Sequence, residues 1–135
     1  MDYVDPSREN LERFKALDRN APMHLLNQIR YRDRAAYPRE HPADAHRWTG
    51  AEAFAEYLRL VVPRIEALGG GLVWNATFEC MVTGPAEPEW DHVFVMGFPR
   101  AANFFALVTD PTYKTEVVVH RTAAVRDSRL IRYRP

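Results

Sequence analysis

The sequence predicts one small α+β domain in which helices pack against a four-stranded antiparallel sheet. Segments with apolar residues at every second position, typical of strands, alternate with segments whose apolar residues recur every three or four positions, typical of helices. The chain has 135 residues, which fits one domain with its own hydrophobic core. Its 47% of hydrophobic and 27% of charged residues place it among ordinary globular proteins.

A helical extension at residues 1–20 precedes the core of the domain, which we place at residues 22–134. We expect Asp5 and Pro6 to open the first helix. Asp5 can accept hydrogen bonds from the free N–H groups of the first turn, and Pro6 has no N–H to lose there. The apolar stripe of this helix is narrow and consists of Leu11, Phe14 and Leu17.

The first strand is expected over residues 23–31, because alternate residues there are suited to opposite faces of a sheet. Asn27 shares one face of this strand with apolar residues, and Arg30 lies on the other face. Residues 32–48 show no periodicity and contain two prolines and two histidines. They predict a long loop, and loops of this length are commonly functional or mobile.

The longest helix is expected to begin at Thr49, which forms a capping-box pattern with Glu52. It should end at Gly69–Gly71, where one glycine can adopt the left-handed cap conformation. Its amphipathic pattern is the strongest in the chain. The apolar positions are Phe54, Leu58, Val61, Ile65 and Leu68.

The second half of the chain alternates again between strands and helices. Trp74 and Cys80 should share the apolar face of a long strand, which makes Cys80 a buried and inert core residue. The valines at 117–119 suit a helix or a strand, and we assign them to a helix. The expected elements are strands at 72–82, 91–98 and 128–133, a short helix after Pro99, and a helix over 112–126.

This order of elements predicts a split βαβ repeat, the ferredoxin-like βαββαβ arrangement, with an extra N-terminal helix. The strands carry apolar residues on both faces, although helices should cover only one face. A second copy of the same sheet is the simplest cover for the other face, which predicts a twofold homodimer. We take Phe94 to lie on the face that dimerises.

Four stretches of the sequence resemble the bacterial family named domain of unknown function 1330. They are Leu68–Trp74, Gly97–Pro99, Asp110–Tyr113 and His120–Ser128, and the resemblance extends over residues 23–133. It implies a ferredoxin-like fold and a dimer of the dimeric α+β barrel superfamily. That superfamily includes cofactor-free monooxygenases, lactone isomerases and haem-degrading enzymes. The resemblance implies no catalytic residue, and it leaves the N-terminal helix and the 32–48 loop as additions to the shorter family core.

Composition argues against several classes of partner. Lys plus Arg and Asp plus Glu both number 18, whereas nucleic-acid binding usually requires a basic excess. The single cysteine, Cys80, excludes an internal disulfide and a metal site built from several thiolates. No signal peptide and no apolar run near the ~20 residues of a membrane span is visible. We therefore expect a cytoplasmic protein without a metal, a cofactor, a nucleic-acid partner or a membrane partner.

Among the five histidines, His92 and His120 are the candidates for a catalytic base, since a histidine in a pocket can exchange a proton near neutral pH. His41 and His46 are interpreted as exposed loop residues. Arg121 beside His120 suits a carboxylate ligand, but it would equally cap the last helical turns or pair with Asp127. The remaining candidates for ligand contact are Asn27, Arg30, Tyr57 and Trp74.

Two hypotheses about function follow. In the first, the protein is a homodimer that binds a small molecule, and whether it is an enzyme stays open. If it is one, we expect cofactor-free proton-transfer or oxidative chemistry with His120 or His92 as base and Asn27 polarising a carbonyl. In the second, it is a non-catalytic accessory domain whose sheet only dimerises and whose polar candidates bond to the protein itself. A cavity between sheet and helices with converging polar groups would favour the first hypothesis.

Overall fold

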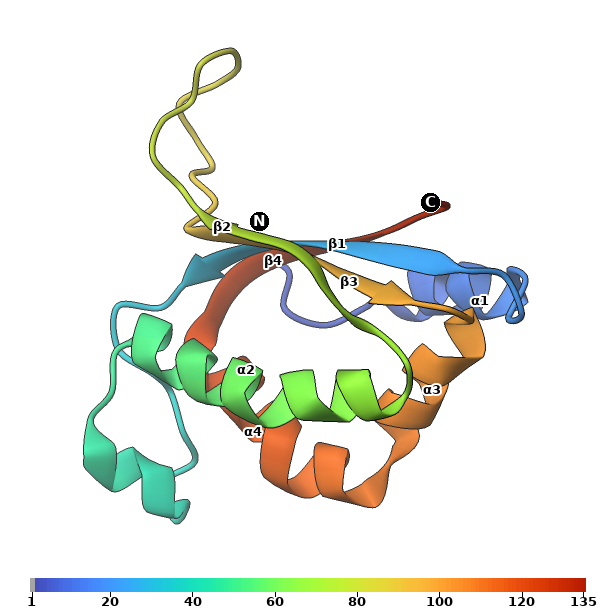
Figure 1. The fold of residues 1–135 in the computed structure, drawn as a ribbon. Helices are drawn as coiled ribbons and strands as arrows, with labels where there is room; N and C mark the ends of the chain where they lie inside the picture. Colours follow the sequence, from blue (N-terminus) through green and yellow to red (C-terminus); the bar gives the residue numbers. More distant parts are fainter. Residues whose placement is uncertain (1) are drawn as a thin grey trace.

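Four strands form one antiparallel sheet in the order β2-β3-β1-β4 in the computed structural model, which describes residues 2–135 (Figure 1). Each neighbouring pair, β1 with β3, β1 with β4 and β2 with β3, is antiparallel. The chain therefore has the expected α+β class and four-stranded antiparallel sheet. The strands are β1 (Met23–Tyr31), β2 (Gly71–Thr77), β3 (His92–Phe98) and β4 (Val125–Tyr133).

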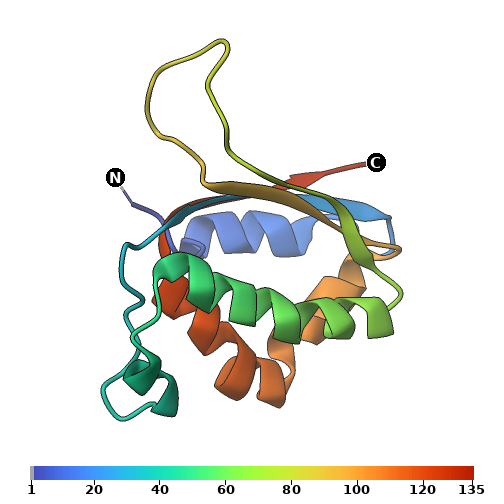
Figure 2. The ribbon, with the colours of Figure 1, turned by 60° about the vertical axis from the view of Figure 1, so that its left-hand side comes forward.

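The helices all lie on one side of this sheet, as the two views in Figure 1 and Figure 2 show. A short 3₁₀ helix, η1, interrupts the long loop before α2, and a π-helical turn, η2, runs directly into α4. The helices are α1 (Arg8–Ala16), η1 (Pro42–His46), α2 (Gly50–Ala67), α3 (Ala101–Thr109), η2 (Tyr113–Val117) and α4 (Val118–Ala124).

The core fills the space between α2 and the helix side of the sheet. Along β1, buried and half-buried residues alternate as the sequence pattern predicts. Met23, Leu25 and Ile29 of β1 are at most 1% exposed, and so is Phe94 of β3. Burying one such side chain contributes about 1.5–3 kcal/mol, so this layer is a main source of stability. The facing residues of α2 are Phe54, Val61 and Ile65, which are equally buried.

The opposite face of the sheet is open in the protomer and carries large apolar side chains. We call it the open face. Phe94 does not belong to it, because Phe94 lies opposite Asn27 in register and packs on the Phe54 ring with centroids 5.9 Å apart. The assignment of Phe94 to a dimer interface is therefore wrong by one residue, since neighbouring strand residues point to opposite faces. The apolar side chains of the open face are Leu26, Val73, Trp74, Val93, Val95, Ile131 and Tyr133.

Helix boundaries agree with the sequence at α2 and differ at α1. Thr49 and Glu52 form the complete capping box at the start of α2. Gly69 has φ +84°, the positive value expected at the end of this helix. Asp5 and Pro6 do not open α1, because Ser7 caps it by accepting from the N–H of Asn10 at 3.1 Å. Ser7 is as good a cap as aspartate, and the sequence pattern did not distinguish them.

The strand after α2 is shorter than predicted. β2 ends at Thr77 and has a register shift between Leu72 and Trp74, which places Trp74 opposite Val95 on the open face. A bulge of this kind changes which face the following residues occupy. Residues 78–91 form a loop that rises from the sheet on the side away from the helices (Figure 2). Cys80 lies in this loop and is exposed, so its assignment to the core is wrong.

The last helix and strand also meet at a different residue from the one predicted. The valines at 117–119 are helical, as assigned, but β4 begins at Val125, three residues before the expected start at Ser128. Val125 and Arg126 therefore belong to the strand and not to the helix. No helix in residues 2–135 is long and apolar enough to cross a membrane.

Candidate functional site

His120 lies on α4, where the 32–48 loop folds over it. Its Nδ1 is 2.6 Å from the hydroxyl oxygen of Tyr37, a hydrogen bond between two buried side chains far apart in sequence. Either group can be the donor, depending on the tautomer of His120. Nε2 has no hydrogen-bond partner among residues 2–135, and it is not sealed from solvent. The free Nε2 is therefore the atom of His120 that can exchange a proton with another molecule.

Main-chain hydrogen bonds hold the loop in this position. The N–H of Ala36 donates to the carbonyl oxygen of Ala123 on α4 at 2.9 Å. The N–H of Ala35 donates to the carbonyl oxygen of Trp48 at 3.0 Å. Gly50 at the start of α2 allows the loop to approach, since a Cβ there would lie 2.1 Å from the carbonyl oxygen of Arg32. The position of Tyr37 is thus fixed by the backbone on both sides of it.

Aromatic rings surround the pair of Tyr37 and His120. His41 stacks on Tyr37 with ring centroids 5.4 Å apart and meets His120 edge-on at 5.9 Å. Trp48 approaches both rings, at 6.2 Å from Tyr37 and 6.5 Å from His120. We call Tyr37, His41, Trp48 and His120 the His120 cluster. His46 stacks on the outer side of Trp48 at 4.4 Å.

Burial favours the neutral forms of His120 and Tyr37. Burial lowers the pKa of His120 from the usual value near 6.5, while Glu56 opposes this shift and the His41 ring adds to it. Burial, assisted by Glu56, raises the pKa of the Tyr37 hydroxyl to about 12. At neutral pH the cluster therefore holds an uncharged imidazole beside an un-ionised phenol. A neutral imidazole with a free nitrogen is the form that can act as a general base.

His92, the other candidate base, is fully bonded within the protein. Its Nδ1 is 3.0 Å from the Tyr31 hydroxyl oxygen, and its Nε2 bonds to the side-chain oxygen of Asn75. An amide oxygen only accepts, so Nε2 carries the proton and Nδ1 accepts from Tyr31. Burial lowers the pKa of His92, which agrees with this neutral ring. Neither nitrogen is free, and His92 is less suited than His120 to act on a ligand.

Asn27 and Tyr57 are buried on the helix side of the sheet and are bonded to nearby protein groups. The side-chain amide of Asn27 donates to the carbonyl oxygen of Leu25, two residues away on the same strand, at 3.1 Å. The hydroxyl oxygen of Tyr57 is 3.0 Å from that of Tyr113. Burial raises the pKa of Tyr57 well above its usual value. These contacts fit structural roles.

The other candidate residues lie apart from the His120 cluster. Arg121 donates to the carbonyl oxygen of Val4 at 2.9 Å and approaches the Ser128 hydroxyl at 3.4 Å, so it fastens the N-terminal segment. It does not pair with Asp127, whose carboxylate bonds to Arg129. Arg30 and Trp74 lie on the open face, on the other side of the sheet. The candidates predicted from the sequence therefore do not converge on one pocket.

Two hollows of the surface lie away from the His120 cluster. One is lined by residues of the α1–β1 linker and of the C-terminal end of β4, and the other lies beside Gly69–Gly71. Neither includes His120 or His92 in its lining. No group of three or more His, Cys, Asp or Glu side chains within residues 2–135 is arranged to hold a metal ion.

Comparison with known proteins shows a close similarity to a protein with a solved crystal structure. The chain is 47% identical to the RPA0582 protein of Rhodopseudomonas palustris, a protein of unknown function, and superposes on its crystal structure with a TM-score of 0.87. The match covers 100% of this chain and 98% of that one. The chain belongs to the RPA0582 family. A crystal structure of methylated RPA0582 matches with the same identity and a TM-score of 0.88, over 99% of this chain and 95% of that one. No protein-family model and no curated protein matches the chain.

In this member of the RPA0582 family, the sequence pointed to His120 as a candidate but not to the residues that surround it. The interpretation of His41 as an exposed loop residue is wrong, because it is half-buried between Tyr37 and His120, whereas His46 is exposed as expected. The available signal was the density of aromatic and histidine residues in the 32–48 loop. The composition of the loop does not show which of its aromatic and histidine side chains are buried against α4.

Proposed function

We propose that the protein is a homodimer that binds a small molecule, with Nε2 of His120 as the group that exchanges a proton with it. One observation carries this proposal. His120 is the candidate histidine that is held rigidly, by Tyr37, and still has a free nitrogen. A base needs both properties, because the reacting atom must be oriented and must have no competing partner.

The reaction class that fits this group is proton transfer without a cofactor. With its pKa lowered by burial, His120 is neutral at pH 7 and ready to accept a proton. Tyr37 at Nδ1 fixes the orientation of the ring and stabilises the imidazolium that would form after proton transfer. Asn27 has no part in this proposal, because its amide is bonded within β1 on the sheet. Cofactor-free oxidative chemistry would begin with the same proton transfer.

The dimer is the second part of the proposal, and the open face supports it. The strand order β2-β3-β1-β4 fits the ferredoxin-like βαββαβ topology. In a dimeric α+β barrel, a second copy covers the face that the helices leave open. Trp74 is 52% and Val73 56% exposed on the edge strand β2 of that face, which a soluble monomer rarely tolerates in one patch. Membership of the domain of unknown function 1330 family is part of the same proposal.

A non-catalytic accessory domain is the alternative, and specific contacts favour it. His92, Asn27 and Tyr57 all have protein partners, as that hypothesis expects. The two hollows described above also lie away from both histidines. The alternative differs from the main proposal in one respect, which is whether Nε2 of His120 meets a ligand.

Native mass spectrometry of the purified protein, beside a denaturing run of the same sample, tests the proposal. We expect a dimer that carries additional mass, and this mass should be released on denaturation. The variant His120→Gln should lose the adduct, while His46→Gln, which removes an exposed histidine nearby, should keep it. A dimer without an adduct would favour the accessory-domain alternative. An adduct that survives in His120→Gln would contradict the role of Nε2, because the ligand would then be bound elsewhere. A monomer would contradict the dimer as well.

A further inference from the structure

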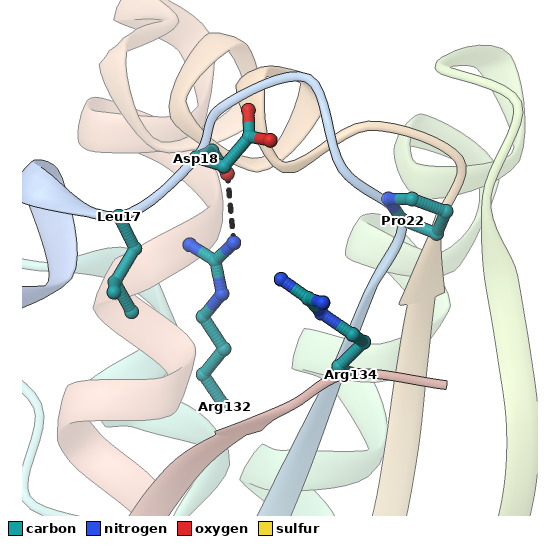
Figure 3. Close-up of a pocket in the computed structure, with 5 residues that line it drawn as sticks. All are labelled: Leu17, Asp18, Pro22, Arg132 and Arg134. Carbon is teal, nitrogen blue, oxygen red and sulfur yellow. Dashed lines mark hydrogen bonds between the residues drawn. The ribbon is translucent and has the colours of Figure 1, made fainter.

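A hollow of about 200 Å³ lies where the linker between α1 and β1 passes the C-terminal end of β4 (Figure 3). It is separate from the His120 cluster, and the inference drawn from it does not depend on the proposed function. Its chemistry is unusual because two arginine side chains meet in it. The residues that line it are Leu17, Asp18, Pro22, Arg132 and Arg134.

The guanidinium of Arg132 is held in place, but one of its two terminal nitrogens has no hydrogen-bond partner. Its Nη2 donates to the main-chain oxygen of Asp18 at 2.7 Å, and its guanidinium lies 5.7 Å from the centre of the Phe14 ring. Its Nη1 is buried and has no hydrogen-bond partner, the one such side-chain atom in the described part of the chain. A buried donor without an acceptor is costly. Figure 3 shows this nitrogen on the side of the guanidinium that faces Leu17, so an added acceptor reaches it only when the Leu17 side chain moves.

Arg134 adds a second positive charge to the same hollow. Figure 3 shows its guanidinium facing that of Arg132, while the carboxylate of Asp18 is directed away from both. That carboxylate accepts from the N–H of Asn20 at 2.8 Å. Neither arginine is in any of the ion pairs formed within residues 2–135. Two adjacent guanidinium groups without a carboxylate repel each other unless an anion lies between them.

We propose that this hollow binds a small oxyanion, the phosphate or carboxylate group of a small molecule, through the guanidinium groups of Arg132 and Arg134. Guanidinium groups bind such oxygens through paired, charge-assisted hydrogen bonds. Leu17 lies beside Arg132 in the hollow and is 52% exposed, so its side chain can move to uncover Nη1. The apolar Leu17 and Pro22 would then contact the carbon part of the ligand.

Titration with inorganic phosphate, followed by two-dimensional NMR of backbone and arginine side-chain N–H groups, tests this proposal. Sodium chloride is reduced as phosphate is added, so that the ionic strength and the screening of charges stay constant. We expect saturable shifts centred on Arg132 and on the 17–22 linker. The variant Arg134→Gln should weaken phosphate binding about tenfold, as the loss of one charge-assisted contact implies. Arg126→Gln removes an exposed arginine about 20 Å away on the same strand and should bind as wild type does.

A parallel titration with acetate identifies the type of oxyanion. Binding of phosphate alone supports a phosphate site, and binding of both supports a site that also accepts carboxylates. Shifts that do not saturate, or that are the same in Arg134→Gln as in wild type, would overturn the proposal. Because Arg134 is exposed, that variant should fold normally, and a urea unfolding curve verifies this. Arg132→Lys keeps the charge but loses the paired donors, and it should also weaken phosphate binding.

Discussion

Val95 lies at the centre of the open face, and replacing it by aspartate separates dimerisation from folding. In register, Val95 of β3 is opposite Leu26 on β1 and opposite Trp74 on β2. It is only half-buried in the protomer, so the fold does not depend on it as it does on Phe94. We expect Val95→Asp to remain folded and to lose the dimer.

The expected magnitudes follow from the burial of the two residues. A dimer of twofold symmetry covers the part of Val95 that the protomer leaves exposed, and it does so twice, so losing two valines from the interface removes about 1–2 kcal/mol of association energy. That corresponds to a dissociation constant raised roughly 5-fold to 30-fold, before the larger cost of burying two carboxylates is added. The cost to the protomer fold is about 1 kcal/mol, from the poor strand propensity of aspartate. Phe94→Ala, in contrast, should cost about 3–5 kcal/mol of folding energy.

Sedimentation velocity over a series of concentrations measures the dimer, and urea unfolding measures the fold. Val95→Thr is the matched control, because it keeps the shape of the side chain without adding a charge. It should dimerise nearly as well as wild type. The reasoning is refuted if Val95→Asp is folded and has the dissociation constant of wild type, since a charge at the centre of an apolar interface must weaken dimerisation.

Three further predictions concern stability and the His120 cluster. Gly50→Ala should lose about 3 kcal/mol or more in urea unfolding, because its Cβ would lie 2.1 Å from a main-chain oxygen, whereas Gly71→Ala meets nothing within 4 Å and should cost far less. The lowered pKa values of His92 and His120 mean that the unfolded chain binds more protons below pH 6.5. The two histidines therefore contribute fully to stability above pH 6.5, and this contribution is lost as the pH falls through their pKa values in the folded protein. A free energy of unfolding that stays flat from pH 7 to pH 5 would contradict this prediction. Tyr37→Phe should cost about 1–3 kcal/mol, because Nδ1 of His120 loses its partner, and unchanged stability would show that this hydrogen bond contributes nothing.

The sequence was sufficient where periodicity alone determines the structure. The limits of β1 agree with the prediction, and Thr49 with Glu52 forms the predicted capping box. Both features depend on residues close together in the chain, so local rules are enough to find them. The prediction failed at β2, where a register shift after Leu72 moves Trp74 to the other face. A bulge is stabilised by the neighbouring strand, and nothing in the residues of β2 themselves indicates it.

The second source of error was the choice of which face of the sheet each strand residue occupies, and this error has a single cause. In β3 the apolar residues occupy both faces, so alternation cannot tell which face meets the helices. Phe94 was assigned to the open face and Cys80 to the core by the same kind of argument. The structure decides both cases through tertiary contacts: Phe94 packs on Phe54, and β2 ends at Thr77 before it reaches Cys80.

The His120 cluster illustrates why a site can be harder to predict than the fold that carries it. Three of its four residues, Tyr37, His41 and Trp48, come from a loop without periodicity, and the fourth comes from a helix more than 70 positions away in the chain. The loop is placed by main-chain hydrogen bonds to α4, such as the one from Ala36 to Ala123. Side-chain identity has little influence on such bonds, so the sequence gives no local sign of them. The same fact makes the site testable, because a side chain in the cluster can be replaced while the backbone bonds that position the loop remain.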